Sequence, residues 1–108
     1  MLVYTNRDEG ILEESYFSSS NVLCIRYLEV EKIMEVLFNS GRLYTYHEIP
    51  RDFFIRIRMA DSQGSKINEL LVKKQVGKKL YNETLSGIIS PEDIAKIKNF
   101  INEKSNKL

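Results

Sequence analysis

The stretch from Ile33 to Gly64 constrains the fold of this chain more than any other. Residues 33–38 are apolar except for one glutamate and place Met34, Val36 and Phe38 on one face at period two, which predicts a β-strand. An Asn-Ser-Gly loop follows, with Gly41 where a tight hairpin needs left-handed backbone. Residues 42–47 return with strong β formers, so the two runs predict a hairpin. Pro50 then suits the first turn of a helix, because the N–H that proline lacks has no partner there.

Further elements are predicted on both sides of this hairpin. Residues 22–27 begin with four apolar residues, Val22 to Ile25, and predict a strand that pairs with it, because short connections favour sequential antiparallel pairing. After Pro50, apolar residues recur every three to four positions, which predicts an amphipathic helix, and Ser65 is placed as the cap of a second helix through Val72. Residues 82–89 resemble a linker. Ser90-Pro91 is the strongest helix start in the chain.

These elements predict an α+β fold: a three-stranded antiparallel β-meander packed by two following helices, plus a C-terminal amphipathic helix. The chain is divided into an N-terminal extension (residues 1–18), a central domain (19–74), and a basic linker with the C-terminal helix (75–108). A length of 108 residues allows one modest core. A small domain with exposed strand edges gains stability by self-association, so a homo-oligomer is expected.

Composition excludes several classes of protein. The net charge of +1 removes any general polycation signature, so phosphate binding requires a local basic patch. Cys24 is the only cysteine, which excludes a disulfide framework or a cysteine-based zinc site within one chain and fits a reducing compartment. No apolar run is long enough to span a membrane and no signal-peptide pattern is present. We therefore expect a cytoplasmic protein without membrane contact.

Catalysis finds little support in the sequence. His47 is the only histidine, and Glu48 beside it points to the opposite face of a strand, so the two do not form an obvious catalytic pair. No metal-ligand spacing, P-loop or dinucleotide fingerprint is present. We expect no enzyme activity, no cofactor and no metal.

Binding residues are more readily proposed than catalytic ones. Tyr44 and Tyr46 share a face and could stack on bases, although they are also in phase with the apolar positions of the facing strand and could pack in the core. Arg26 and Arg42 are expected to share the open face of the meander. The loop over residues 62–66 leads into a helix whose first N–H groups can hold an anion. The candidate ligand-binding set is Arg26, Arg42, Tyr44, Tyr46, Ser62, Gln63, Gly64, Ser65, Lys66 and Asn68. The lysines of residues 73–79 are either solvated surface or a contact to backbone phosphates.

An ordered set of short motifs supports a family resemblance. The motifs are Ser19-Ser20-Asn21, the strand residues Val22, Ile25 and Tyr27, Val36 and Phe38, Gly41, Tyr44 and Tyr46, Ile49-Pro50, Ala60-Asp61-Ser62, Gly64-Ser65, and Asn68. Over residues 19–74 the chain resembles the KTSC domain, a small module named after the C-terminus of some lysyl-tRNA synthetases. Ile67 departs from the family pattern, which usually has an aromatic residue there.

The resemblance implies a function only by association. Attachment to a tRNA enzyme suggests RNA binding, and many similar proteins are single-domain proteins of bacteria and phages. Small phage proteins of this kind often neutralise host defences, some by sequestering cyclic nucleotide signals. We therefore expect non-catalytic binding of a phosphodiester ligand, narrowly a phage-type anti-defence protein that sequesters cyclic (di)nucleotides. The alternatives are a tRNA-related RNA-binding module and a protein-interaction module that inhibits a host partner.

Overall fold

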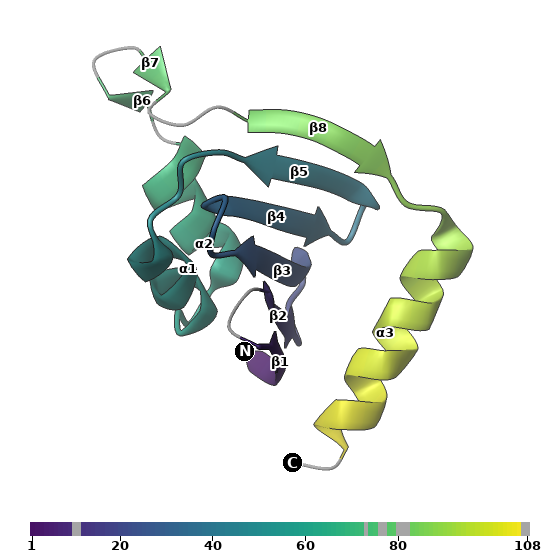
Figure 1. The fold of residues 1–108 in the computed structure, drawn as a ribbon. Helices are drawn as coiled ribbons and strands as arrows, with labels where there is room; N and C mark the ends of the chain where they lie inside the picture. Colours follow the sequence, from purple (N-terminus) through teal and green to yellow (C-terminus); the bar gives the residue numbers. More distant parts are fainter. Residues whose placement is uncertain (10–11, 73, 76–77, 80–82, 107–108) are drawn as a thin grey trace.

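A six-stranded antiparallel sheet forms the centre of the molecule (Figure 1). The computed structural model describes residues 1–9, 12–72, 74–75, 78–79 and 83–106. The sheet has the order β1-β2-β3-β4-β5-β8, formed by β1 (Leu2–Asp8), β2 (Leu12–Phe17), β3 (Val22–Leu28), β4 (Ile33–Phe38), β5 (Arg42–Tyr46) and β8 (Glu83–Ile88). A separate two-stranded sheet pairs β6 (Lys74–Gln75) with β7 (Lys78–Lys79). The helical segments are α1 (Arg51–Arg58), α2 (Gln63–Ile67), the π-helix η1 (Asn68–Val72) and α3 (Pro91–Ser105).

The predicted α+β class is confirmed, but the three-stranded meander is wrong, because β1, β2 and β8 extend it on both sides. β2 escaped prediction because its buried face is partly polar: Glu13 and Ser15 are buried together with Phe17. The linker predicted over residues 82–89 is likewise wrong, since β8 occupies most of it. β8 is an exposed edge strand whose two large apolar residues, Leu85 and Ile88, are three positions apart, so it lacks the apolar alternation that identifies a half-buried strand.

Two predictions from local signals, the turn at Gly41 and the start of α3, are confirmed. Gly41 has the predicted positive φ, +92°, and α3 begins at Pro91 with the Ser90 hydroxyl accepting from the Asp93 N–H at 3.2 Å. The cap assigned to Ser65 is wrong. Ser62 is the cap of α2, and its hydroxyl oxygen accepts a hydrogen bond from the Ser65 N–H at 3.3 Å.

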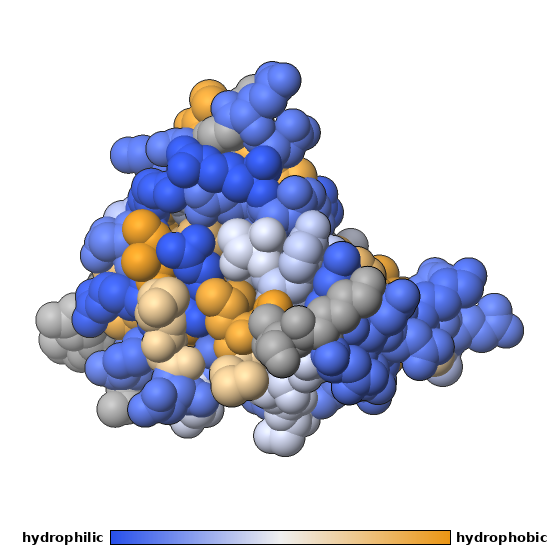
Figure 2. Space-filling view, turned by 90° about the horizontal axis from the view of Figure 1, so that it is seen from below, coloured by the Kyte–Doolittle hydropathy of each residue, from blue (hydrophilic) through white to orange (hydrophobic). Residues whose placement is uncertain are grey.

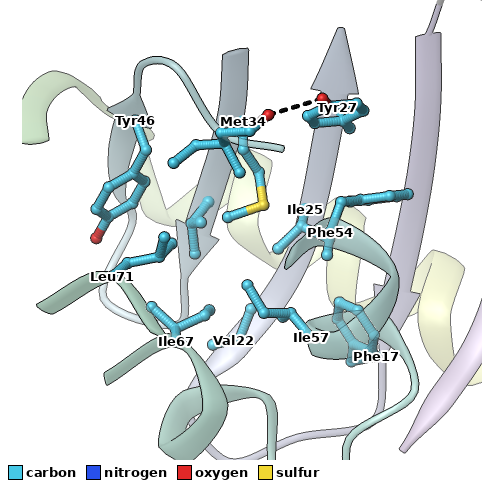
Figure 3. Packing of buried hydrophobic residues seen from close by; sticks show 12 residues of the cluster. Phe17, Val22, Ile25, Tyr27, Met34, Tyr46, Phe54, Ile57, Ile67 and Leu71 are labelled. Carbon is cyan, nitrogen blue, oxygen red and sulfur yellow. Dashed lines mark hydrogen bonds between the residues drawn. The ribbon is translucent and has the colours of Figure 1, made fainter. Parts of the chain in front are cut away.

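One face of the sheet, here called the helical face, packs against α1, α2 and η1 (Figure 3). Its buried residues are Phe17, Val22, Ile25, Tyr27, Met34, Val36, Tyr46, Ile49, Phe54, Ile57, Ile67 and Leu71. The Tyr27 ring stacks on Phe54 with centroids 5.3 Å apart, and its hydroxyl donates to the Ile49 carbonyl at 2.7 Å (dashed in Figure 3). Because the Tyr27 ring packs on α1 and its hydroxyl bonds the segment before α1, this residue attaches both to the sheet.

The opposite face, here called the α3 face, is covered at one end by α3 (Figure 1). Its buried residues are Val3, Leu23, Cys24, Leu37, Ile94 and Ile101. The Lys104 ammonium lies 4.8 Å from the centroid of Tyr4 and 5.5 Å from that of Phe100. The predicted apolar stripe of the C-terminal helix is therefore used within this chain. Among the described residues, no helix is long and apolar enough to cross a membrane.

Candidate functional site

The two arginines predicted to share an open face lie on opposite faces of the sheet, and this expectation is wrong. Arg26 pairs across the sheet with Glu35, on the α3 face, whereas Arg42 is in phase with Tyr44 on the helical face. The Arg26 guanidinium forms ion pairs with Glu14 at 3.4 Å and Glu35 at 3.2 Å. Its charge is therefore balanced by carboxylates. Arg42 is exposed at the start of β5.

The two predicted stacking tyrosines differ in their surroundings. Tyr46 is 1% exposed, and its hydroxyl donates to Glu83 Oε2 at 2.9 Å. Burial and this hydrogen bond raise the pKa of the Tyr46 phenol. Tyr44 is half-buried and meets the Phe38 ring edge-on, with centroids 5.8 Å apart. Tyr46 is thus a core residue, and only Tyr44 keeps part of its ring at the surface.

Residues 62–66 form the start of α2, and the fold already uses most of their polar groups. Gln63 is fully buried: its Nε2 donates to the Ala60 carbonyl at 2.8 Å, and its Oε1 accepts from the N-terminal ammonium at 3.3 Å. Gly64 lies against Asn21, because a Cβ there would come within 2.8 Å of Asn21 Nδ2. Lys66 pairs with Glu69 at 2.8 Å. The segment is primarily a structural cap.

A shallow cavity of about 400 Å³ borders the segment from Ser62 to Lys66. Its lining includes Ser62, Ser65 and Lys66, but also the carboxylates of Asp61 and Glu69. Asn68 is exposed at the junction of α2 and η1. The two acids oppose an anion at this position. The side chains of the lysine cluster over residues 73–79 lie outside the described residues.

Figure 2 shows apolar residues gathered on the underside of the molecule. A cavity of about 360 Å³ is lined by Met1, Leu2, Arg58, Met59, Ala60 and Asp61. Two methionines here, Met1 and Met59, are largely exposed. The side chains of the wall offer one cation and one carboxylate but no hydroxyl or amide, and the Met1 ammonium already donates to the Ser18 carbonyl and to Gln63 Oε1. This wall therefore has little to fix a sugar-phosphate.

A different arrangement, which the sequence did not reveal, brings together two turns of the sheet and α3. Two cavities, of about 270 and 410 Å³, share Asn39 and Lys98, and we refer to them together as the seam groove. The first is lined by Phe17, Ser18, Ser19, Leu23, Asn39, Lys98, Ile101 and Asn102. The second is lined by Asn39, Ser40, Ile88, Ile89, Pro91, Ile94, Ala95 and Lys98.

Hydrogen bonds between the turns fix the shape of the seam groove. Asn39 Nδ2 donates to the Ser20 carbonyl at 2.6 Å, and the Asn39 N–H donates to the Asn21 carbonyl at 2.8 Å. The Ser19 hydroxyl accepts from the Asn21 N–H at 3.2 Å. The Ile89 N–H donates to the Gly41 carbonyl at 2.8 Å, which attaches the chain before α3 to the β4–β5 turn. The groove is thus largely pre-formed, as small-molecule sites usually are.

The chemistry of the seam groove suits a small anion with polar substituents. Lys98 is exposed and contributes a positive charge where the two cavities meet, and the lining residues include no carboxylate. Ser18, Ser19 and Asn102 add hydroxyl and amide groups, while isoleucines form apolar walls. A lysine binds phosphate as a point charge, and neutral donors orient the rest of a ligand.

Only part of this groove could have been found from the sequence. Lys98 and Asn102 are four residues apart, so they share one side of the final helix, beside the stripe of Ile94 and Ile101. Ser19 and Asn39 were visible as turn residues. Nothing local indicated that both turns meet α3, because that contact joins segments far apart in the chain.

The described residues hold no group of three or more His, Cys, Asp or Glu side chains that could bind a metal ion. His47 is exposed at the end of β5. Burial raises the pKa of the Cys24 thiol to about 12, which keeps it protonated and unreactive.

The fold and the sequence signature together identify the class of this protein. A crystal structure of a KTSC domain protein from Yersinia pestis matches with a TM-score of 0.55 and 23% identity, over 68% of this chain and 97% of that one. At that identity the match shows a shared fold. The KTSC domain family also matches by sequence over residues 18–71, half of the chain. The chain therefore belongs to the KTSC domain family. Among curated proteins, none matches it significantly.

Several of the residues that carry the family resemblance have structural roles in the fold. Asn21 contacts Gly64, Gly41 forms the β4–β5 turn, and Ser62 caps α2. β1, β2, the β6–β7 pair, β8 and α3 lie outside the matched residues. The turns of the seam groove thus come from the family region, whereas Lys98 and Asn102 come from α3, beyond it.

Proposed function

We propose that this chain is a non-catalytic binding protein for a small phosphodiester, narrowly a cyclic nucleotide, which it sequesters in the seam groove. The observation that carries the proposal is the position of Lys98, which lines both cavities. The residues that line these cavities offer hydroxyl and amide groups and include no carboxylate. The phosphate would contact the Lys98 ammonium, the sugar hydroxyls would meet Ser18, Ser19 and Asn102, and the base would lie on the apolar wall. No bond is broken in this scheme.

This proposal moves the binding site away from the residues predicted by sequence. Arg26 is neutralised by two carboxylates, and Tyr46 is buried. Arg42 remains part of the proposal, because it follows Gly41 directly and pairs with Ile88, which lines the second cavity. An anti-defence role in a phage would follow from sequestration of a host signal, and it is part of the same proposal.

A compact ligand is favoured over an extended RNA by the charges around the candidate site. The net charge of the chain is +1, and Arg26 forms ion pairs with Glu14 and Glu35 on the two neighbouring strands. A continuous basic track, which RNA binding with many phosphate contacts requires, is therefore interrupted on the α3 face.

The proposal is tested by calorimetric titration with a 3′,5′-cyclic mononucleotide, a 3′,3′-cyclic dinucleotide and a short single-stranded RNA. We expect binding of a cyclic nucleotide that weakens about tenfold or more in Lys98→Glu, since a charge-assisted contact of ~1.5–3 kcal/mol is lost. The ligand should be recovered unchanged in mass after incubation.

Lys96→Glu is the matched control. Lys96 lies on the same helix, is largely exposed and lines neither cavity of the groove. It should bind within about twofold of the parent chain, because a distant exposed charge is largely screened. RNA binding whose affinity falls steeply with salt would favour the RNA alternative. No binding to any of the three probes would refute the proposal and leave the protein-interaction alternative.

A further inference from the structure

We propose that two copies of this chain pair antiparallel through the outer edge of β8, so that two six-stranded sheets join into one. The inference rests on the composition and register of β8. It does not depend on what the seam groove binds.

The outer edge of β8 is open among the described residues. β8 is the last strand of the sheet and is hydrogen-bonded to β5 alone, and Figure 1 shows it at the margin of the sheet. Residues 84–86 and Ile88 are exposed. An edge strand presents a row of unpaired backbone N–H and C=O groups, which is a template for another strand.

The edge of β8 lacks the residues that usually prevent such pairing. It contains neither lysine nor proline, and its one charged residue, Glu83, accepts a hydrogen bond from the Tyr46 hydroxyl within the same chain. The opposite edge, β1, ends in Arg7 and Asp8. Charged and proline residues protect exposed edges against association, so β1 is protected in a way that β8 is not.

A β-bulge gathers the apolar side chains of β8 on one face. Leu85 lies opposite Tyr44 and Gly87 lies opposite Leu43, so Ser86 is an extra residue in the register. In a regular strand, Leu85 and Ile88 would point to opposite faces because they are three residues apart. The bulge places both on the helical face, where they are 48% and 73% exposed.

These features make β8 complementary to itself. A two-fold axis perpendicular to the sheet keeps the helical faces of both copies on the same side. Leu85 of each copy can then lie opposite Ile88 of the other, giving two apolar cross-strand pairs. The two Glu83 carboxylates lie towards opposite ends of the paired strands, so no like charges meet. A second copy would therefore hydrogen-bond the open backbone groups of β8 and cover its exposed apolar side chains.

The proposed pairing also reaches the seam groove. Ile88 lines the second cavity of the groove as well as contributing to the edge of β8. The β8 strand of a second copy would therefore lie at the rim of that cavity. The occupant we propose is a second copy of this chain, and an unrelated protein partner is an outcome of the test below.

Sedimentation velocity at micromolar protein concentration tests the pairing. We expect the parent chain to have twice the monomer mass of 12.6 kDa, and Ile88→Lys to sediment as a monomer with an unchanged far-UV circular dichroism spectrum. Because Ile88 is mostly exposed, its replacement should not unfold the chain. Leu85→Lys should have the same effect on mass. Hydrogen exchange should show the outward β8 amides protected in the parent and unprotected in Ile88→Lys.

Val30→Lys is the matched control, since Val30 is an exposed apolar residue (77%) in the β3–β4 turn, away from β8. It should sediment as a dimer like the parent. A monomeric parent chain would overturn the proposal and leave the β8 edge for another protein. A dimer that persists in Ile88→Lys with unchanged exchange of the β8 amides would also overturn it, by placing the interface elsewhere.

Discussion

Glu13 is a carboxylate in the interior of β2, 3% exposed, and its surroundings show how single residues are accommodated here. Its Oε1 accepts from Arg51 Nη2 at 2.7 Å and lies 3.2 Å from Arg7 Nε. The hydrogen bond to Glu13 raises the pKa of the Arg51 guanidinium. A buried carboxylate is tolerated only when it is paired in this way, so Glu13 connects β1, β2 and the start of α1.

Cys24 leads to a pH prediction at the same scale. Burial raises the pKa of its thiol to about 12, whereas an unfolded thiol ionises near pH ~8.5. Between these values the folded chain holds a proton that the unfolded chain has lost, so stability falls as pH rises through this window. We expect the melting temperature to fall more steeply above pH ~9 in the parent chain than in Cys24→Val.

The comparison with Cys24→Val removes the contribution of the tyrosines, which both chains share. The melting temperatures of the two chains, measured by circular dichroism across that range, should diverge as the solution becomes more alkaline. Parallel curves would show that the thiol does not carry the effect. Iodoacetamide should also label native Cys24 far more slowly than the denatured chain, because the thiolate is the reactive form.

At the scale of elements, short segments are stabilised mainly by their caps and by packing. α2 has five residues and continues directly into η1. A helix this short is unstable by itself, so the Ser62 cap and the burial of Ile67 and Leu71 hold it.

Replacing Ser62 by alanine should therefore destabilise the chain by about 1 kcal/mol, because the Ser65 N–H loses its acceptor. Urea unfolding measures the change. Ser65→Ala is the control: it removes a hydroxyl that accepts from the Ser62 hydroxyl at 3.1 Å but leaves the Ser65 N–H in place. We expect a loss below about 0.5 kcal/mol for this exposed change. Equal losses in both variants would contradict the assigned cap.

At the scale of the whole molecule, one turn connects the family region to the C-terminal elements. The Gly41 carbonyl accepts from the Ile89 N–H, and a Cβ at Gly41 would lie 2.6 Å from the Ile89 carbonyl oxygen. Gly41 also has φ of +92°. Only glycine satisfies both the backbone angle and the close approach.

Gly41→Ala should accordingly weaken the attachment of α3 and widen the seam groove. We expect a loss of more than about 1 kcal/mol in urea unfolding, since the native conformation is incompatible with a side chain. Hydrogen exchange should rise first in β8 and α3. Gly87→Ala is the control, because a Cβ there meets nothing within 4 Å and the residue has no positive φ. A Gly41→Ala chain as stable as Gly87→Ala would refute this account.

The parts of the fold that depend on a local signal were predicted well from the sequence. The hairpin around Gly41, the helices after Pro50 and Ser90, and the family resemblance were all recovered. The sequence did not show which of the candidate site residues are exposed, because that depends on pairing across the sheet and on the packing of the helices. The position of Tyr46 in the sequence fits either base stacking or core packing, and the tyrosine is buried because the helices cover its face of the sheet.

The sequence by itself determined the turns, the start of α3 and the apolar runs of β3 and β4, since these depend on backbone angles and on residues a few positions apart. The tertiary structure alone decided that β1, β2 and β8 join the same sheet, that Arg26 and Arg42 lie on opposite faces, and that α3 meets two distant turns to form the seam groove. The physical reason is that β8 is hydrogen-bonded to β5, a strand far away in the chain, and that the buried Glu13 of β2 is paired with Arg51, 38 residues further on; local periodicity encodes neither contact.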